Sequence, residues 1–482
     1  MPVILECLER RRLFNVTLEY NGSGGDDAYL VRLKGGDPST VEIVETLDDG
    51  AAVTHAAAAG AVTLVDIATG AGFDVLTVDQ SNGPVPPVTF AGGSSFDEMV
   101  YVGSAGTDVV TVNPNSLDGP GVSVGYGSVE GIALNGHAGD DAFVIGTGNL
   151  DAITAAVTVI GGGGTDTVRA DDDQNSFEDA YTLTATRLDR DVFGSLNYEQ
   201  IEGLTLDAQG GGNVFIVNST AAGTPATING GGGSDVLILN AYASHVAFNG
   251  GLNPAEADSL IINSGTYTLA TDAGAGTANL DLQVNSGAHV VFNASQRLAS
   301  LNLYGGGGAT VAPNGSRVID VGTLDLDGGT LDLKDNDLVA RGMLTETVTA
   351  YVNAGRGSGA WDGGSGIVTT VPAAAAGAGA ATHLGVATAS QALAIAAGAT
   401  GTWGGRAVSG SAVLVKYTHS GDADLNGIVD GDDYFLLDAH VGVPPAVARP
   451  IWFHGDFNYD GKINGDDYFL IDSVIDSQGG VI

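Results

Sequence analysis

The chain has 482 residues, and 57 Asp and Glu against 17 Lys and Arg give it a formal net charge of −40. This balance argues against binding to nucleic acid or to an anionic membrane surface, because both need Lys and Arg. It suits an exported protein that meets calcium, since hard cations prefer oxygen ligands. The one cysteine, Cys7, excludes a disulfide framework. No stretch reaches the roughly 20 apolar residues of a membrane helix, so we expect no membrane span.

The first segment, residues 1–14, reads MPVILECLERRRLF. Charges stand where a secretory signal has its apolar core, so we do not expect a standard signal peptide. The run from Leu8 to Phe14 resembles the LEPR-type N-terminal motif of large repetitive bacterial surface proteins. That resemblance implies a targeting role for residues 1–14, and the alternative is an amphipathic terminus without one.

Residues 15–250 contain turns of one form: Gly, two residues, Gly, one residue, Asp, one residue and a large apolar residue. The acidic or amide position falls at Asp27, Asp74, Asp97, Asp141, Asp166, Asn213 and Asp235. Each interval is close to one or two units of roughly 23, and such a fixed period indicates a repeat array. Asp108 falls off this register. Short alternating runs between the turns place one face of each strand inside. We therefore predict an all-β fold, a right-handed parallel β-helix (solenoid) whose rungs of about 23 residues have two or three short strands each.

A longer echo is superimposed on this period. Tyr126-x-x-Val-Glu130-Gly-Ile-x-Leu recurs, at a shift of 72, as Tyr198-x-x-Ile-Glu202-Gly-Leu-x-Leu. Three steps of about 23 come close to that shift, which is consistent with the same repeat array.

Residues 251–418 form a second predicted solenoid region. Leu282, Leu303 and Leu324 recur at a constant interval of 21, and the stretch Leu280–Val339 resembles the autotransporter-associated β-strand repeats of bacterial surface proteins. We expect a short helix over Thr345–Ala354. The Ala/Gly-rich segment Pro372–Thr402 is expected to be a loose loop or a poorly specified strand region.

Two twelve-residue loops in residues 419–482 have the ligand spacing of EF-hand calcium loops. In the first loop, positions 1, 3, 5, 9 and 12 are Asp422, Asp424, Asn426, Asp430 and Asp433, and Ile428 offers its carbonyl at position 7. In the second, the same positions are Asp456, Asn458, Asp460, Asn464 and Asp467, with the carbonyl of Lys462 at position 7. Each loop can wrap six to eight oxygens around one calcium ion, so we predict two bound ions. Repulsion between the carboxylates should couple calcium binding to folding.

An amphipathic helix is predicted after each loop, and residues 431–438 match residues 465–472 at seven of eight positions. Position 12 is Asp, and no helix precedes the first loop. In these features residues 419–482 resemble type I dockerins, which implies a small α-helical module that docks onto a cohesin-type domain. Dockerins often have Ser or Thr at loop positions 10 and 11 and a basic residue one turn later. This chain has Gly-Asp, followed by Asp438 and Asp472, so a rival interpretation is that the module caps the chain's own solenoid.

The chain contains other motifs that resemble functional sites. The Gly-x-x-Gly-x-Asp turns resemble RTX nonapeptides, which implies further calcium at Asp141, Asp166 or Asp235, whereas the alternative is that each Asp caps its own turn. Gly121–Gly125 has the spacing of a hydrolase elbow around Ser123 but lacks the strand-to-helix context. The histidines lack zinc spacing, and no carboxylate pair for glycan cleavage stands out.

The sequence thus predicts no catalytic residues. It favours an exported, calcium-binding, structural or adhesive protein at a bacterial cell surface, with a cohesin-type domain or its own solenoid as the module's partner. The alternative is a dockerin-bearing component of a polysaccharide-degrading assembly, a glycoside hydrolase or polysaccharide lyase with polysaccharide as ligand.

Overall fold

The structure is a computed structural model that describes residues 16–48, 50–251, 253, 255–274, 276–374, 381–445, 449–476, 478 and 481–482. The predicted targeting motif at residues 1–14 lies outside the described residues. The chain is mostly β, with 44% strand, 10% helix and parallel sheets, which confirms the all-β prediction. No helix among the described residues is long and apolar enough to cross a membrane. The chain divides into two compact units, Met1–Gly231 with Tyr242–Asn249, and Gly232–Ala241 with Gly250–Ile482.

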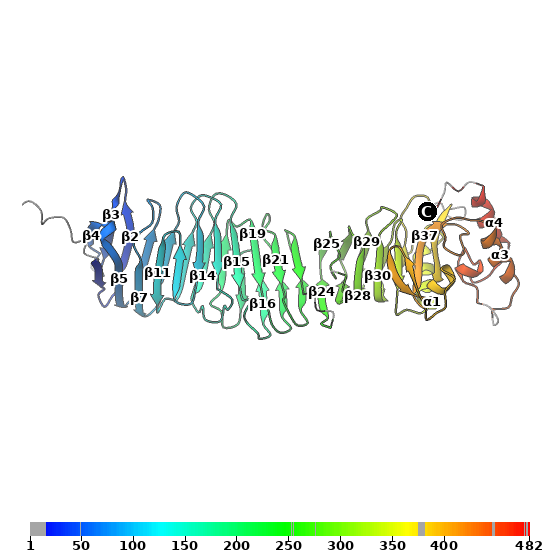
Figure 1. The fold of residues 1–482 in the computed structure, drawn as a ribbon, viewed down its shortest axis with the longest axis horizontal. Coiled ribbons are helices and arrows are strands. Elements are labelled where there is room, and N and C mark those ends of the chain that lie inside the picture. The colour runs from blue at the N-terminus through cyan, green and yellow to red at the C-terminus, as the bar shows by residue number, and fades with distance from the viewer. Residues whose placement is uncertain are drawn as a thin grey trace, which may run out of the picture. The chain divides into compact units, whose positions relative to one another are not determined.

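The first unit contains two sheets between which the chain alternates (Figure 1). Sheet one has the order β1 (Val16–Asn21), β5 (Val62–Ala71), β7 (Val88–Ser94), β11 (Val122–Gly127), β10 (Ser116–Gly119), β9 (Val109–Val112), β13 (Ala142–Ile145), β15 (Thr167–Asp171), β19 (Gly203–Asp207), β21 (Ala226–Asn229) and β23 (Val246–Asn249). Sheet two has the order β4 (Ala52–Ala58), β3 (Asp37–Thr46), β2 (Ala28–Lys34), β6 (Val75–Asp79), β8 (Glu98–Val102), β12 (Gly131–Asn135), β14 (Ala156–Ile160), β18 (Leu196–Glu199), β17 (Arg187–Arg190), β16 (Ala180–Leu183) and β20 (Val214–Val217).

Each simple repeat of the first unit has two strands, one in each sheet. Val65 pairs in parallel with Val88, at a sequence offset of 23, and Ile132 pairs with Val157, at an offset of 25. Strands such as β6 and β8 alternate buried and half-buried residues, so that one face of each sheet forms the core. The predicted period is therefore present, whereas a third strand in each of these repeats is not.

Apart from the antiparallel strands β2, β3 and β4 at one edge of sheet two, two antiparallel meanders interrupt the parallel order of the first unit. In sheet one, β9, β10 and β11 pair antiparallel, and in sheet two the same holds for β16, β17 and β18. The parallel offset grows to 33 between Glu98 and Gly131, and to 36 between Thr167 and Gly203. Each meander adds two strands to its own sheet. From β5 and β6 to β19 and β20, both sheets consequently contain eight strands.

The sequence echo of Tyr126 at Tyr198 marks the last strand of each meander. The Tyr126 hydroxyl donates to the carbonyl of Asn113, and the Tyr198 hydroxyl donates to the carbonyl of Thr184 at 2.6 Å. Each tyrosine thus ties the third strand of its meander to the residues that follow the first strand. The glutamates of the echo accept a backbone N–H from the preceding repeat, and the one at position 130 bonds Asp97 at 2.8 Å.

The second unit continues with two sheets. The longer sheet has the order β22 (Val236–Leu239), β24 (Asp258–Ile262), β26 (Leu280–Val284), β28 (Gln296–Leu303), β30 (Val318–Asp325), β32 (Asp337–Ala340), β37 (Val413–His419) and β34 (Thr382–Thr388), of which the last two pair antiparallel. The other sheet has the order β25 (Gly265–Leu269), β27 (Ala288–Phe292), β29 (Gly308–Val311), β31 (Thr330–Asp332) and β33 (Gly366–Val368). Leu282 pairs with Leu301 and Leu301 with Leu324, so the predicted interval of 21 is an average of offsets of 19 and 23.

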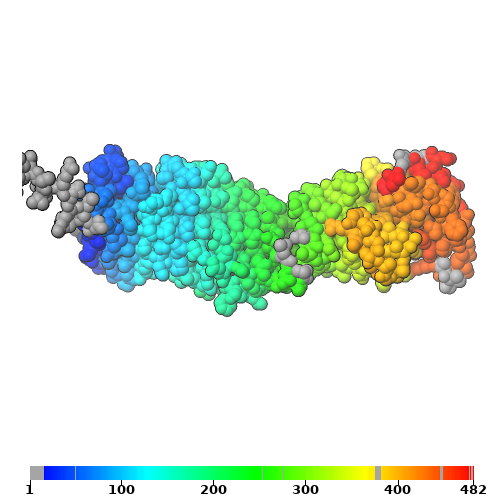
Figure 2. Space-filling model, viewed as in Figure 1, coloured from blue at the N-terminus to red at the C-terminus, as the bar shows by residue number. Residues whose placement is uncertain are grey.

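The predicted helix is confirmed as α1 (Thr345–Arg356). Of the two alternatives for Pro372–Thr402, a loose loop or a strand region, the second fits residues 381–402, which contain β34, α2 (Ala389–Ala392) and the start of β35 (Thr400–Trp403), paired with β36 (Arg406–Ser409). Residues 375–380 lie outside the described residues. After β37 the chain enters a module with α3 (Gly431–His440), η2 (Trp452–His454) and α4 (Gly465–Ile475). In Figure 2 its surface, orange to red, is continuous with that of the preceding strands.

Candidate calcium-binding site

The first acidic loop begins shortly after β37. Its first residue, Asp422, accepts the N–H of Gly427 on Oδ2 at 2.9 Å and a hydrogen bond from the Thr418 hydroxyl. Its last residue, Asp433, accepts the N–H groups of Ala423 at 2.7 Å and of Asp430 at 2.8 Å. Both ends of the loop are thereby folded toward one centre. Ligand oxygens of Asp422, Asp424 and Asp433 lie within 4.8 Å of one another, as a metal site requires.

The second loop repeats the backbone N–H bonds of the first. Asp456 accepts the N–H of Gly461 at 3.1 Å, and Asp467 accepts the N–H groups of Phe457 at 2.9 Å and of Asn464 at 3.0 Å. Positions 4 and 6 of both loops have left-handed backbone: φ is 62° and 89° in the first loop and 54° and 81° in the second. Glycine at position 6 meets this requirement at no steric cost.

One carboxylate oxygen of each loop is buried without a partner. Asp422 is 0% exposed and Asp456 is 3% exposed, and Oδ1 of each has no hydrogen bond. A buried acceptor left unsatisfied costs about 1–3 kcal/mol, so it needs a donor or a cation. Burial raises the pKa of Asp422 to about 6 and that of Asp456 to about 7. An all-oxygen donor set with these orphaned oxygens fits calcium.

The helix starts fix the last ligand position of each loop. Asp430 and Asp433 form a capping box at the N-terminus of α3, and Asn464 and Asp467 form one at α4. Because position 12 of each loop is also the third residue of a helix, the helix sets where that carboxylate lies. Positions 3 and 5 make bonds only within the loop, such as the N–H of Asn426 to Asp424 at 3.0 Å. Their side chains are more exposed than those at positions 1 and 12.

Both loops pack against strand β34 of the longer sheet, which we call the floor of the loops. The Trp452 indole donates to the carbonyl of Asp422 at 2.7 Å, and the Tyr459 hydroxyl donates to the carbonyl of Leu384 on β34 at 2.6 Å. The contact is tight at Gly385, where a Cβ would lie 2.5 Å from Cδ2 of Leu425 and 2.6 Å from the Trp452 indole nitrogen. Position 4 of each loop, Leu425 or Tyr459, is buried in this contact.

The outer face of the module has a pair of reciprocal contacts. The Tyr434 hydroxyl on α3 donates to Asp472 on α4 at 2.6 Å, and the Tyr468 hydroxyl on α4 donates to Asp438 on α3. Next to these tyrosines, Phe435 is 71% exposed and Phe469 61% exposed. The two halves therefore present the same aromatic residue to solvent.

The Gly-x-x-Gly-x-Asp turns form hydrogen-bond ladders. The N–H of Asp74 donates to Asp97 at 3.0 Å at the entrance to sheet two, and the N–H of Asp141 donates to Asp166 at 2.8 Å at the entrance to sheet one. The turns of the predicted period thus form two ladders, one at the entrance to each sheet. Asp108 begins the second ladder by donating its N–H to Asp141 at 2.8 Å. Asp235, in the second unit, donates in the same way to the residue at position 258 at 3.1 Å.

These ladders explain the recurrent spacing within each turn. A Cβ on Gly136 would lie 2.3 Å from Oδ2 of Asp141 and 2.4 Å from the carbonyl oxygen of Gly161. Each of the carboxylates at positions 74, 97, 141 and 166 accepts a backbone N–H from a neighbouring repeat, rather than capping its own turn as the alternative supposed. The elbow-like segment around Ser123 is part of strand β11, and the Ser123 hydroxyl donates to Asp118 at 2.6 Å.

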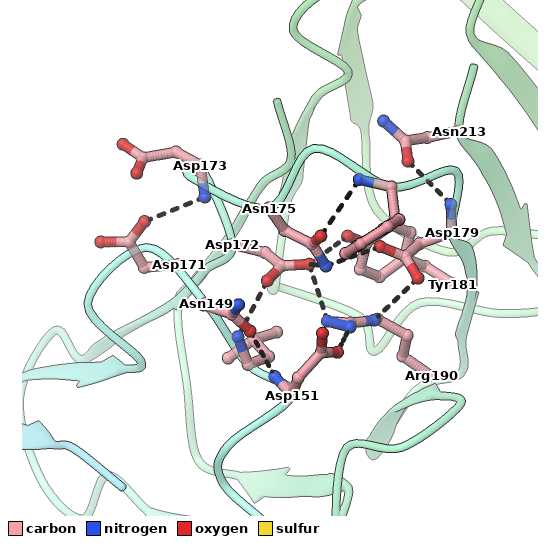
Figure 3. Close-up of polar contacts among 12 residues, drawn as sticks. Asn149, Asp151, Asp171, Asp172, Asp173, Asn175, Asp179, Tyr181, Arg190 and Asn213 are labelled. Carbon is pink, nitrogen blue, oxygen red and sulfur yellow. Dashed lines mark hydrogen bonds and ion pairs between the residues drawn. The ribbon is translucent and has the colours of Figure 1, made fainter. Parts of the chain in front are cut away.

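A buried ion-pair network that the sequence did not indicate lies beside the second meander (Figure 3). The Arg190 side chain on β17 is 1% exposed and contacts three carboxylates: Asp151, Asp172 at 2.7 Å and Asp179 at 3.3 Å. The Tyr181 hydroxyl on β16 also donates to Asp172 at 2.5 Å. Because these residues come from four separate segments, no local motif reveals them. The contacts tie the meander to the preceding loops.

A scan against protein-family models and a search of curated proteins returned no match to this chain.

Proposed function

We propose that this chain is an exported, calcium-binding, non-catalytic structural or adhesive protein of a bacterial cell surface. In this proposal the parallel sheets are the coils of a right-handed β-helix, and the C-terminal module binds two calcium ions and caps its end. The observation that carries the proposal is the orphaned Oδ1 of Asp422 and Asp456. The same oxygen is left without a donor at the first position of both loops, where an EF-hand loop places a calcium ligand.

The contacts with the sheet favour capping as the module's role. The Tyr459 hydroxyl donates to the carbonyl of Leu384 on β34, and the Trp452 indole donates to the carbonyl of Asp422 in the first loop. The absence of a side chain at Gly385 lets the Trp452 indole lie close to β34. An ion that closes the loops would thereby hold Leu425 and Tyr459 against β34. Calcium would stabilise the end of the sheet as well as the module, because binding only the folded state shifts the folding equilibrium.

A second candidate is a dockerin-like role in a polysaccharide-degrading assembly. It is supported by the exposed Phe435 and Phe469, which occupy equivalent positions in the two halves of the module. Asp438 and Asp472, where dockerins often have a basic residue, bond the tyrosines of the opposite helix. Calcium-dependent capture by an immobilised cohesin domain, lost in a Phe435→Ser and Phe469→Ser double variant, would favour this candidate.

Calorimetric titration of the full chain with calcium tests the main proposal. We expect two ions to bind the wild type, and none to bind at comparable affinity when Asp424→Ala and Asn458→Ala remove position 3 of both loops. These two residues are only half-buried, so the change leaves the buried floor intact. Asp166→Asn is the matched control in a ladder turn and should keep both ions. A wild type that binds no calcium would overturn the proposal.

A further inference from the structure

The two loops differ in charge although their backbone N–H bonds are the same. Four of the five ligand side chains in the first loop are carboxylates, whereas the second has three, because Asn458 and Asn464 replace aspartates while Asp460 replaces an asparagine. The second loop also contains Lys462 at position 7. Fewer ligand charges lower the calcium affinity of such loops. The sequence of the loops alone thus makes the second loop the weaker site.

A cation from outside the module adds to this difference. Arg356, the last residue of α1, lines a cavity of about 430 Å³ together with Asn458 and Asp460, which hold positions 3 and 5 of the second loop. Among the described residues the guanidinium forms no hydrogen bond or ion pair, and its Nε is buried. Desolvation lowers the pKa of Arg356, and the attraction of Asp456, Asp460 and Asp467 opposes that shift.

The first loop faces a different cation. Lys416 on β37 approaches its far side, where a Cβ on Gly427 would lie 2.9 Å from the ammonium nitrogen. Lys416 also attracts Asp337 of the neighbouring strand β32, and it lies 6.0 Å from the centre of the Trp403 ring. Its charge is therefore shared with groups outside the loop. Among the described residues Arg356 has no attractive partner outside the second loop. Besides that loop its charge acts on His383, whose pKa is lowered by burial and by the repulsion of the guanidinium.

We propose that Arg356 sets the calcium affinity of the second loop: its unpaired guanidinium, in the cavity beside Asn458 and Asp460, competes with the ion. This inference rests on the proposed calcium function. It makes the first loop a permanently filled, structural site and the second loop a weaker one that responds to the calcium concentration. Since α1 belongs to the sheet-bearing part of the unit, the packing of the module on the sheet controls that response.

The test is calorimetric calcium titration of the full chain at low salt. A unit charge roughly 7–10 Å from a divalent ion, at a dielectric constant near 80, changes a binding constant by about four- to sevenfold. We expect Arg356→Met, which removes the charge and keeps an apolar stem, to tighten the weaker step by that factor. Arg356→Gln serves as a second charge-removing variant, and Arg356→Lys as the matched control that keeps wild-type affinity. Asp460→Asn identifies the weaker step, because it should weaken that step alone.

Two further readouts separate the charge from packing. The tightening should shrink at high potassium chloride, because salt screens charges that lie near the surface. The calcium affinity of the stronger step should be the same in the wild type and in every Arg356 variant. If the calcium affinity of the weaker step is unchanged or lower in both charge-removing variants, the role of Arg356 is overturned. Two bound ions and the proposed function would remain intact in that case. No bound calcium in the wild type would instead overturn both.

Discussion

The contact at Gly385 gives the sharpest test of the idea that the sheet is the floor of the calcium loops. In Gly385→Ala the new methyl group would lie 2.5 Å from Leu425 and 2.6 Å from the Trp452 indole nitrogen. Overpacking of this kind costs about 1–3 kcal/mol. Displacing the indole would also weaken its 2.7 Å bond to the carbonyl of Asp422, at a further cost of about 0.5–1.5 kcal/mol. We expect the free energy of unfolding of the second unit to fall by about 2–4 kcal/mol.

Tryptophan fluorescence provides the assay, since all three tryptophans, at positions 361, 403 and 452, belong to the second unit. For a unit of this size the loss corresponds to a decrease in Tm of roughly 4–16 °C. Calcium affinity should fall as well, because the same methyl group displaces the first loop. Gly398→Ala is the control, since a Cβ there meets nothing within 4 Å. A variant of Gly385 that unfolds and binds calcium like this control would refute the reasoning.

Three further predictions concern other parts of the chain. Replacing Arg190 with Met leaves the buried Asp172 and the half-buried Asp151 and Asp179 without their counter-charge, so we expect the first unit to lose about 3–5 kcal/mol and the second meander to lose hydrogen-exchange protection. Gly136→Ala should destabilise the first unit in chemical denaturation, and Gly163→Ala, whose Cβ meets nothing within 4 Å, should not. Without calcium, the raised pKa values of Asp422 and Asp456 mean that the folded module binds protons more tightly than the unfolded chain. Its stability should therefore fall as the pH rises from about 4 to 7, and calcium binding in that window should release protons that a pH-stat can count.

The parts of the fold that depend on short stretches of chain could be predicted from the sequence. The ligand spacing of each acidic loop and the helix that follows it both lie within one short segment. The capping boxes at Asp430 and Asn464 are equally local. Alternation of apolar residues likewise indicates strands, because it depends only on the two faces of a strand.

The order of the strands could not be predicted in the same way. A strand of a meander has the same alternation as a strand of a parallel coil, and its direction depends on partners far away in the chain. The average period near 23 therefore concealed offsets of 33 and 36 in the pairing. The echo of Tyr126 at Tyr198 did signal the meanders, but its meaning required the hydroxyl bonds to Asn113 and Thr184. The partners of Arg190 carry no local signal at all.

The equal strand count of the two sheets limits how this chain can change length. A whole repeat can be gained or lost before the first meander or after the second, because one strand then enters or leaves each sheet. Loss of either meander alone would leave two strands of the opposite sheet facing no counterpart, with their apolar side chains in water. We therefore expect the loss of one meander to be tolerated only together with the loss of the other. The two additional strands that the first meander gives to sheet one are thus matched by the two that the second meander gives to sheet two.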